Sequence, residues 1–223
     1  MVRIMEKFNQ NKRNQIFDEI VKSRHSVRAF KDDKPPKKCI GEIIRAGMLA
    51  PYAAAAVGGV KDFRRFFVFE KNSSSSETLA LLMKNKAEES VQHFESLIAE
   101  KPFIKSKVQP FLNRLQMVVD KGVPGVTTAP YFIIVAELRG FPPSEQESLA
   151  HVLENMWLKS TALDLGFQLV SLTSQMAEDE ELMKLLGLPV KKFALNGCAI
   201  GYPANIPSVT PRPDIREATQ WMD

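Results

Sequence analysis

The stretch Ser23-Arg24-His25-Ser26-Val27-Arg28-Ala29-Phe30 places two arginines four residues apart, with a histidine and a serine between them. An arginine guanidinium is planar, stays charged at every physiological pH and matches the geometry of a phosphate group. The stretch is therefore a candidate cradle for a phosphorylated cofactor. The alternative is a solvated, charged loop after a helix, because motifs of this length also occur by chance.

The size and composition of the chain are those of an ordinary globular protein. Its 223 residues suffice for one large domain with a proper core, and we predict a single domain over residues 1–223. Hydrophobic residues make up 44% and charged residues 25% of the chain, which is typical of such domains. The net charge of +4 suits an anionic ligand, whereas the mixed charge pattern and 14 prolines argue against a nucleic-acid partner.

Membrane and metal partners are not expected. No apolar run approaches the roughly 20 residues that a membrane span needs, and the polar N-terminal stretch lacks the apolar core of a signal peptide. The two cysteines, Cys39 and Cys198, lie far apart without a CxxC motif, and the three histidines are scattered. These patterns argue against a metal site and a disulfide framework, and they make the cytoplasm the expected location.

Hydrophobic periodicity predicts alternating helices and strands. Helices are expected over residues 14–23, 37–49, 77–99, 105–119, 144–165 and 178–186, and strands over residues 65–70, 129–138, 167–172 and 193–202. Ser144 and Glu147 have the spacing of a capping box. The order favours one layered domain with its core over residues 14–204. Residues 205–223 form a proline-rich, polar tail that we expect to pack on another surface, such as a second subunit.

Several separated motifs follow one another along the chain. They are Arg24-His25-Ser26-Val27-Arg28-Ala29-Phe30, Leu49-Ala50-Pro51 with a small-residue loop after it, Glu154-Asn155-Met156, Ala162-Leu163-Asp164-Leu165-Gly166, Leu185-Leu186-Gly187-Leu188-Pro189, Ala199-Ile200-Gly201-Tyr202-Pro203, and Pro211-Arg212-Pro213 ahead of Trp221. In this order and spacing the chain resembles the FMN-dependent nitroreductase family over nearly its whole length. The ordered set, rather than any single motif, carries the resemblance.

The resemblance implies an α+β fold in which helices flank a mixed central β-sheet. It also implies an intertwined homodimer with two FMN molecules at the subunit interface, where the long helices form the interface. In such a dimer the tail over residues 205–223 would wrap the partner subunit, which gives that unpatterned segment a physical role.

The resemblance also assigns residues to FMN. Arg24 and Ser26 would grip the phosphate and the ribityl chain, and Arg212 would reach the same phosphate from the tail. Arg28 would lie nearer the pyrimidine edge, where a cation favours the anionic reduced flavin. His25 would add a ring or backbone contact, although a packed histidine at a helix end is the equal alternative. The segment Leu172-Thr173-Ser174 would lie along the flavin near its N5 atom.

One loop departs from the family pattern. Many relatives follow the Ala-Pro pair with a serine, then an asparagine and a glutamine, whereas this chain has Tyr-Ala-Ala-Ala-Ala-Val-Gly over residues 52–58. Pro51, Tyr52, Ala53 and Ala55 would therefore meet the flavin through backbone groups, which small side chains permit. Each side-chain hydrogen bond lost would cost about 1 kcal/mol. The alternative is a helix extension or a packing loop. Thr173 and Ser174 also replace glycines often seen in the family.

The leading functional hypothesis is an FMN-dependent NAD(P)H oxidoreductase of nitroreductase type. NADH or NADPH would deliver hydride to the flavin N5, and a nitroaromatic, quinone or flavin acceptor would then take the electrons in a ping-pong cycle. The flavin carries this chemistry, so no side chain is assigned as catalytic. Two alternatives stay open: a flavin-binding protein without turnover, and a diverged member with another flavin reaction such as reductive dehalogenation.

Overall fold

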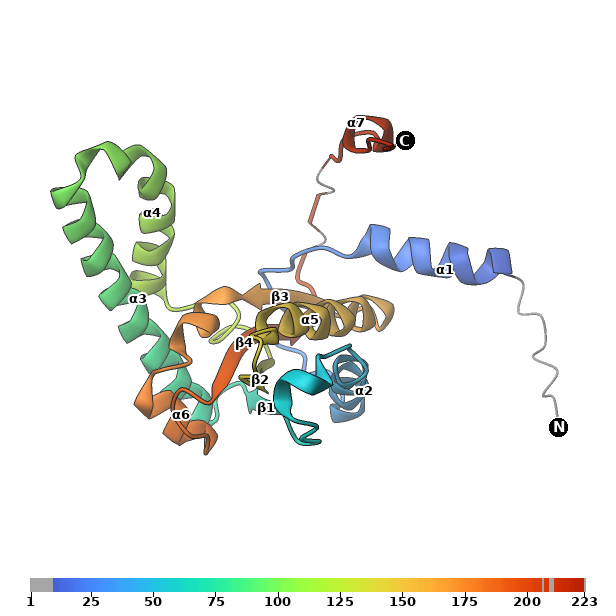
Figure 1. Cartoon of the computed structure of the whole chain (residues 1–223), viewed down its shortest axis with the longest axis horizontal. Helices are drawn as coiled ribbons and strands as arrows, with labels where there is room; N and C mark the ends of the chain where they lie inside the picture. Colours follow the sequence, from blue (N-terminus) through green and yellow to red (C-terminus); the bar gives the residue numbers. More distant parts are fainter. Residues whose placement is uncertain (1–9, 206, 209–210, 223) are drawn as a thin grey trace.

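The computed structural model describes residues 10–205, 207–208 and 211–222 (Figure 1). Its helices are α1 (Gln10–Ser23), α2 (Lys37–Met48), α3 (Ser74–Glu100), α4 (Lys105–Lys121), α5 (Glu145–Ala162), α6 (Glu180–Leu186) and α7 (Ile215–Ala218). Its strands are β1 (Arg64–Glu70), β2 (Tyr131–Leu138), β3 (Gly166–Val170) and β4 (Phe193–Gly201), and its short 3₁₀ turns are η1 (Ala54–Val57), η2 (Pro102–Ile104) and η3 (Ser171–Met176). Each helix and strand expected from periodicity is present, with its ends displaced by a few residues.

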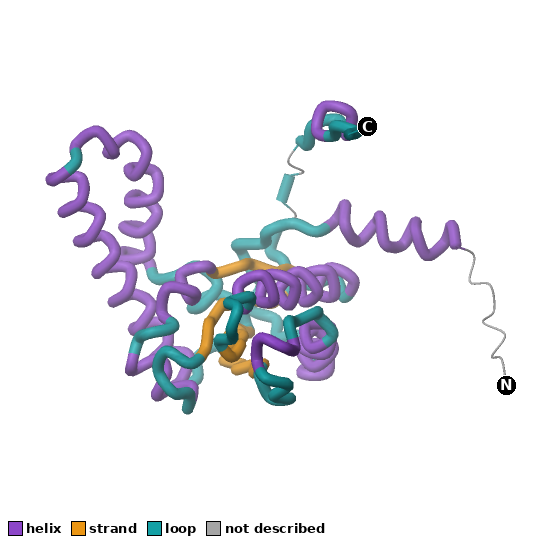
Figure 2. Tube along the Cα trace, viewed as in Figure 1, coloured by secondary structure: helices purple, strands orange, loops and turns teal. Residues whose placement is uncertain are grey.

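The four strands form one sheet in the order β1-β2-β4-β3, and the three pairings between them are antiparallel. The parallel component is a single bridge in which Ser26 pairs with Phe167 at the beginning of β3. Helices cover both faces of this small sheet, as the purple tube around the orange strands shows in Figure 2. The predicted α+β fold with helices flanking a central sheet is thereby confirmed.

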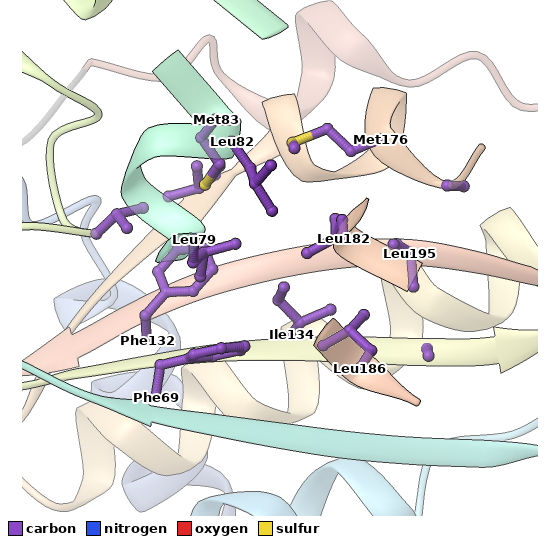
Figure 3. Packing of buried hydrophobic residues seen from close by; sticks show 14 of the residues in the cluster. Phe69, Leu79, Leu82, Met83, Phe132, Ile134, Met176, Leu182, Leu186 and Leu195 are labelled. Carbon is purple, nitrogen blue, oxygen red and sulfur yellow. The ribbon is translucent and has the colours of Figure 1, made fainter. Parts of the chain in front are cut away.

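The sheet separates two apolar layers. On one face, α3, α6 and η3 pack over the sheet through residues such as Leu79, Met176 and Leu182 (Figure 3). On the other face, α2 and α5 contribute the second layer. The central strand β2 serves both: Phe132, Ile134 and Ala136 belong to the first layer, whereas Tyr131, Ile133 and Val135 belong to the second. This alternation follows from the two-residue period of a strand, and burying each large apolar side chain stabilises the fold by roughly 1.5–3 kcal/mol.

Two helical segments extend beyond this body. The helices α3 and α4 form a hairpin that projects from the sheet (green in Figure 1), and a third apolar cluster holds the pair together. The helix α1 leaves the body on the other side, and its apolar residues Ile16, Phe17 and Val21 are exposed. One chain therefore leaves the apolar face of α1 uncovered.

The start of α5 differs from the capping box expected there. The Ser144 side chain makes no capping hydrogen bond. Instead, Glu145 is buried, its Oε2 accepts from the Ser144 backbone N–H at 3.0 Å, and its Oε1 lies 3.4 Å from Arg139 Nη1. The prediction that Ser144 and Glu147 form this cap is wrong because the buried carboxylate of Glu145, two residues before Glu147, already accepts from the Ser144 N–H.

Candidate functional site

The arginine turn, residues 24–30, lies as an extended segment along the edge of the sheet. At one end the Val27 N–H donates to the Phe167 carbonyl at 3.0 Å. At the other end Phe30 forms a bridge with Pro203, and the backbone of residues 29–31 exchanges hydrogen bonds with Tyr202 and Ala204. The turn is thus fixed between the beginning of β3 and the segment that follows β4.

Its side chains alternate between the core and the surface. Val27 is buried against Gly166, where an added Cβ would lie only 2.7 Å from Val27 Cγ1. Because successive side chains of an extended segment point to opposite faces, Ser26 and Arg28 share the other face. Arg28 is exposed there. Gly166 therefore permits the close approach that turns the polar face of the segment outward.

Arg24 is held by helix α5. Its guanidinium carbon lies 4.3 Å from the centre of the Trp157 ring, and its Nε lies 3.3 Å from Glu154 Oε1. Trp157 stacks in turn on Phe167, with ring centres 5.0 Å apart. Within the described part of the chain, no hydrogen bond engages the two Nη groups of Arg24, so they remain available to an anionic ligand.

His25 lies on the opposite side of the turn. Its carbonyl accepts from Trp157 Nε1 at 3.2 Å. Its side chain borders a cavity of about 280 Å³ that is also lined by Val27 and Asp164. The Asp164 carboxylate disfavours a phosphate in this cavity, so the face that carries Ser26 and Arg28 is the better anion site.

The small-residue loop after α2 is fixed at both ends. At its start, the Pro51 carbonyl accepts from Arg64 Nη2 at 3.4 Å and from Ser148 Oγ at 3.2 Å. Near its end, the Ala56 carbonyl accepts from the Phe141 N–H at 2.9 Å, and an added Cβ on Gly140 would lie 2.5 Å from that carbonyl.

Between these anchors the loop is open to solvent. Tyr52, Ala53, Ala54 and Ala55 are exposed, and the Tyr52 ring lies 4.0 Å from the ring of Phe63. The segment is not a continuation of α2, since that helix ends at Met48 and the loop holds only the short turn η1. The loop thus presents backbone and methyl groups, together with one phenol.

The segment 172–174 lies within η3, directly after β3. Leu172 is partly buried, whereas Thr173 is fully buried and its hydroxyl faces Gly197, whose added Cβ would lie 2.6 Å from Thr173 Oγ1. Ser174 Oγ donates to the Ser171 carbonyl at 2.7 Å. The Thr173 hydroxyl is therefore directed into the protein, and the Ser174 hydroxyl is engaged within the segment.

The structure brings some of the predicted site residues together and separates others. The turn and η3 flank the two ends of the five-residue strand β3. The loop contacts α5 at Ser148, and the turn contacts α5 at Trp157. These two positions lie roughly 13 Å apart along the helix. Arg212 is exposed on the tail, which leaves the body (Figure 1), so a single chain does not bring it to the turn.

Lysines beyond the turn pair with a carboxylate at the end of β1. Glu70 accepts hydrogen bonds from Lys34 and from Lys37, the latter over 2.6 Å, and these bonds lower the pKa of Glu70 to about 2. A hydrogen bond from Lys71 likewise lowers the pKa of Asp32. These pairs tie the segment between the turn and α2 to the sheet.

Sequence reasoning missed the residues that support the site from behind. Arg64, Ser148 and Trp157 contact the loop or the turn and are at least partly buried. One signal was present: Glu137 stands within the apolar run of β2, and a charge in a strand buried on both faces requires a buried partner. That partner is Arg64, which lies opposite it in the register.

The turn carries side-chain donors of the kinds that bind phosphate groups. Arg24 offers free Nη groups, Arg28 adds a second cation, and Ser26 adds a hydroxyl, which suits a dianion. In the described part of the chain, His, Cys, Asp and Glu side chains form no group of three that could hold a metal ion. No helix among the same residues has both the length and the apolar character to cross a lipid bilayer.

The chain belongs to the nitroreductase family, whose model matches residues 21–202. The match begins at the end of α1, before the turn, and ends at Tyr202, whose carbonyl binds the Lys31 N–H. The resemblance noted in the sequence is confirmed by this match. The chain matches none of the curated proteins with which it was compared.

Solved structures share the fold. A nitroreductase with bound FMN from Bacteroides fragilis is 19% identical, covers 93% of this chain and 98% of its own, and has a TM-score of 0.67. A BluB-like flavoprotein from Clostridium difficile is 18% identical over 92% and 98% of the two chains, with a TM-score of 0.69. An iodotyrosine deiodinase bound to FMN and 3-iodo-L-tyrosine is 17% identical over 89% and 95%, with a TM-score of 0.61.

Proposed function

We propose that the protein is a cytoplasmic, homodimeric, FMN-dependent NAD(P)H oxidoreductase. The observation that carries the proposal is the extended arginine turn in a chain of the nitroreductase family: Arg28 is exposed, Ser26 is partly exposed, and no hydrogen bond among the described residues engages the Nη groups of Arg24. Relatives with this fold bind FMN, which supports the same cofactor here. Bound FMN would supply the hydride chemistry between NADH or NADPH and a nitroaromatic, quinone or flavin acceptor.

Each site residue then has a role that its position favours. Arg24 and Ser26 bind the phosphate and the ribityl chain, and Arg28 lies toward the pyrimidine edge. The backbone of the loop between Pro51 and Ala55 and the backbone of residues 172–174 border the flavin ring. His25 acts through its backbone, because its carbonyl orients Trp157 beneath Arg24.

The arrangement of the single chain favours a dimer. The loop and the turn contact α5 at points roughly 13 Å apart. One chain therefore offers two separate parts of a flavin site, which a second copy of the chain would complete. The exposed apolar residues of α1 give such a copy a surface to bury. In this arrangement Arg212 reaches the phosphate that the partner's turn binds.

An absorption spectrum tests the cofactor and the reaction together. The purified protein is expected to be yellow with FMN-like absorption, and NADH or NADPH is expected to bleach it without oxygen. A preparation that is colourless and leaves added FMN unbound contradicts the proposal. Sedimentation of the same sample at several concentrations checks the dimer.

A second reaction is favoured by one comparison. The shared fold with an iodotyrosine deiodinase supports reductive dehalogenation as an alternative use of the same flavin. Because the loop over residues 52–58 has no side-chain amide, the surroundings of the flavin ring would differ from those in many relatives in either reaction.

A flavin-binding protein without turnover would bind FMN yet stay oxidised with both nicotinamides, and anaerobic stopped-flow measurements separate these outcomes.

A further inference from the structure

A buried arginine lies directly beneath the small-residue loop. The side chain of Arg64 is 5% exposed and that of its ion-pair partner Glu137 is 4% exposed, with 3.1 Å between Nε and Oε2. The pair lies across β1 and β2, where the two residues are direct neighbours in the register. Because the pair is neutral as a whole, it can be buried without an uncompensated charge.

The remaining guanidinium donors of Arg64 bind the chain at the end of α2 and Ser148 on α5. Nη1 donates to the carbonyls of Gly47 and Ala50, both over 3.1 Å. Nη2 donates to the Pro51 carbonyl over 3.4 Å and to Ser148 Oγ over 2.9 Å, and Ser148 Oγ donates to the same Pro51 carbonyl. The last carbonyls of a helix lack partners within it, so a cation here both satisfies them and fixes the direction in which the chain leaves.

The direction of the Pro51 carbonyl decides where the next N–H points. In a trans peptide the carbonyl and the following N–H point to opposite sides of the chain. Because the Pro51 carbonyl points inward to Arg64 and Ser148, the Tyr52 N–H points outward. Among the described residues, no backbone hydrogen bond uses the N–H groups of Tyr52 or Ala53. The loop therefore offers main-chain donors where its side chains offer no amide.

We infer that Arg64 is the positioning residue of this loop: it holds the backbone so that the Tyr52 and Ala53 N–H groups bind the acceptor atoms of the flavin ring. The inference rests on the proposed function, since it assigns the flavin ring to the loop and the phosphate to the turn. Arg64 does not touch the ligand. It replaces, through the backbone, the orientation that polar loop side chains would otherwise supply.

The test separates the two ends of the cofactor by comparing FMN with riboflavin, which lacks the phosphate. The variant Arg64→Met combined with Glu137→Leu removes both buried charges together, which preserves stability better than removal of one. It is expected to lower the affinities for FMN and riboflavin by the same factor, about tenfold or more. The variant Ser148→Ala, a smaller change that removes one donor to Pro51, is expected to lower both affinities less.

Arg65→Met is the matched control. Arg65 is the next residue of β1, but it lies on the exposed side, where it pairs with Asp62. Its affinities for both flavins are expected to equal those of the unmodified protein. Hydrogen exchange gives a readout that does not depend on turnover: riboflavin is expected to slow the exchange of the amides of residues 52–55 in the control but not in the Arg64 variant.

The outcomes are distinct. If the Arg64 and Ser148 variants fold and bind both flavins as the control does, the positioning role is overturned while the proposed function stands. A loss of FMN affinity alone also overturns it, because that result places Arg64 at the phosphate. If the unmodified protein binds neither flavin, the proposed function fails and the inference fails with it.

Discussion

Arg24 lies over Trp157, with 4.3 Å between the guanidinium carbon and the ring centre, and Trp157 lies on Phe167. Three segments that are distant in the sequence thus form one stack: the turn, α5 and β3. The stack holds the Arg24 guanidinium against α5, and Glu154 engages its Nε, while no hydrogen bond among the described residues engages its Nη groups. A cation–π contact of this kind contributes about 0.5–2 kcal/mol.

Replacing Arg24 by alanine is expected to lower FMN affinity by about 1–3 kcal/mol, the loss of a charge-assisted contact. Riboflavin affinity is expected to change little, because riboflavin carries no phosphate. Fluorescence titration with both flavins measures the difference. Glu154→Gln is the control, since it removes the ion pair of Arg24 but keeps the cation. Equal FMN affinity in the alanine variant and the unmodified protein would sink the phosphate assignment.

Gly166→Ala is expected to destabilise the protein by about 1–3 kcal/mol, because its methyl group would overlap Val27. The same overlap would displace the turn, so FMN affinity is expected to fall as well. Gly41→Ala is the matched control: a Cβ there meets nothing within 4 Å, and alanine in the interior of α2 is expected to stabilise by about 0.5–1 kcal/mol. Urea denaturation measures both changes, and opposite signs are the expected result.

Acid is expected to weaken the ion pairs that join Lys34 and Lys37 to Glu70 at the end of β1. The Glu70 pKa lies at about 2 in the folded protein, below its ordinary value of 4.5. A depressed carboxyl pKa adds stability that is complete above the ordinary value and is lost as the pH falls from 4.5 through about 2. Unfolding free energies measured from pH 6 to pH 2 should therefore fall less steeply for Glu70→Gln. The variant with both Lys34 and Lys37 changed to methionine should show the same shallower slope, and a slope equal to that of the unmodified protein would contradict the assignment.

The two thiols are expected to differ in reactivity. Burial raises the pKa of the Cys198 thiol far above its ordinary value, so the reactive thiolate does not form in the folded protein. Cys39 is partly exposed on α2. A thiol-specific chromogenic reagent should therefore label one cysteine in the native protein and two in denaturant. Cys39→Ser should show no native reaction, and labelling of that variant before unfolding would refute this account.

Much of the fold was predictable because its signals are local. The strand over 129–138 and the helix over 144–165 carry strong apolar patterns, and the structure places β2 and α5 there. The parallel bridge and the strand order were not predictable from periodicity, since they depend on contacts between distant segments. The capping box failed for a different reason: Glu145, which is buried beside Arg139, competes locally with Glu147 for the Ser144 N–H.

Some residues of the candidate site could be predicted from the sequence, and others could not. Arg24, Ser26 and Arg28, which we propose to face the ligand, stand in one short motif, so they could be proposed from the sequence. The residues that hold them in place are spread along the chain: Trp157 supports the turn from α5, and Arg64 supports the loop from β1. Neither residue belongs to a sequence motif. Each acquires its role only because the fold places it beneath the turn or the loop. The tail stays a prediction, because Arg212 meets the turn only if a second chain brings it there.

The hydrogen bonds that fix the turn join residues 26–31 to Phe167 and to residues 202–204, which are far from them in the sequence. The supports of the turn are Glu154, Trp157, Phe167 and the segment 202–204, so the full set is present only after synthesis has passed residue 204. Contacts between segments so distant in sequence form late and slowly. A newly made chain would therefore meet its cofactor only after the sheet has closed, and a free flavin would select finished molecules over folding intermediates.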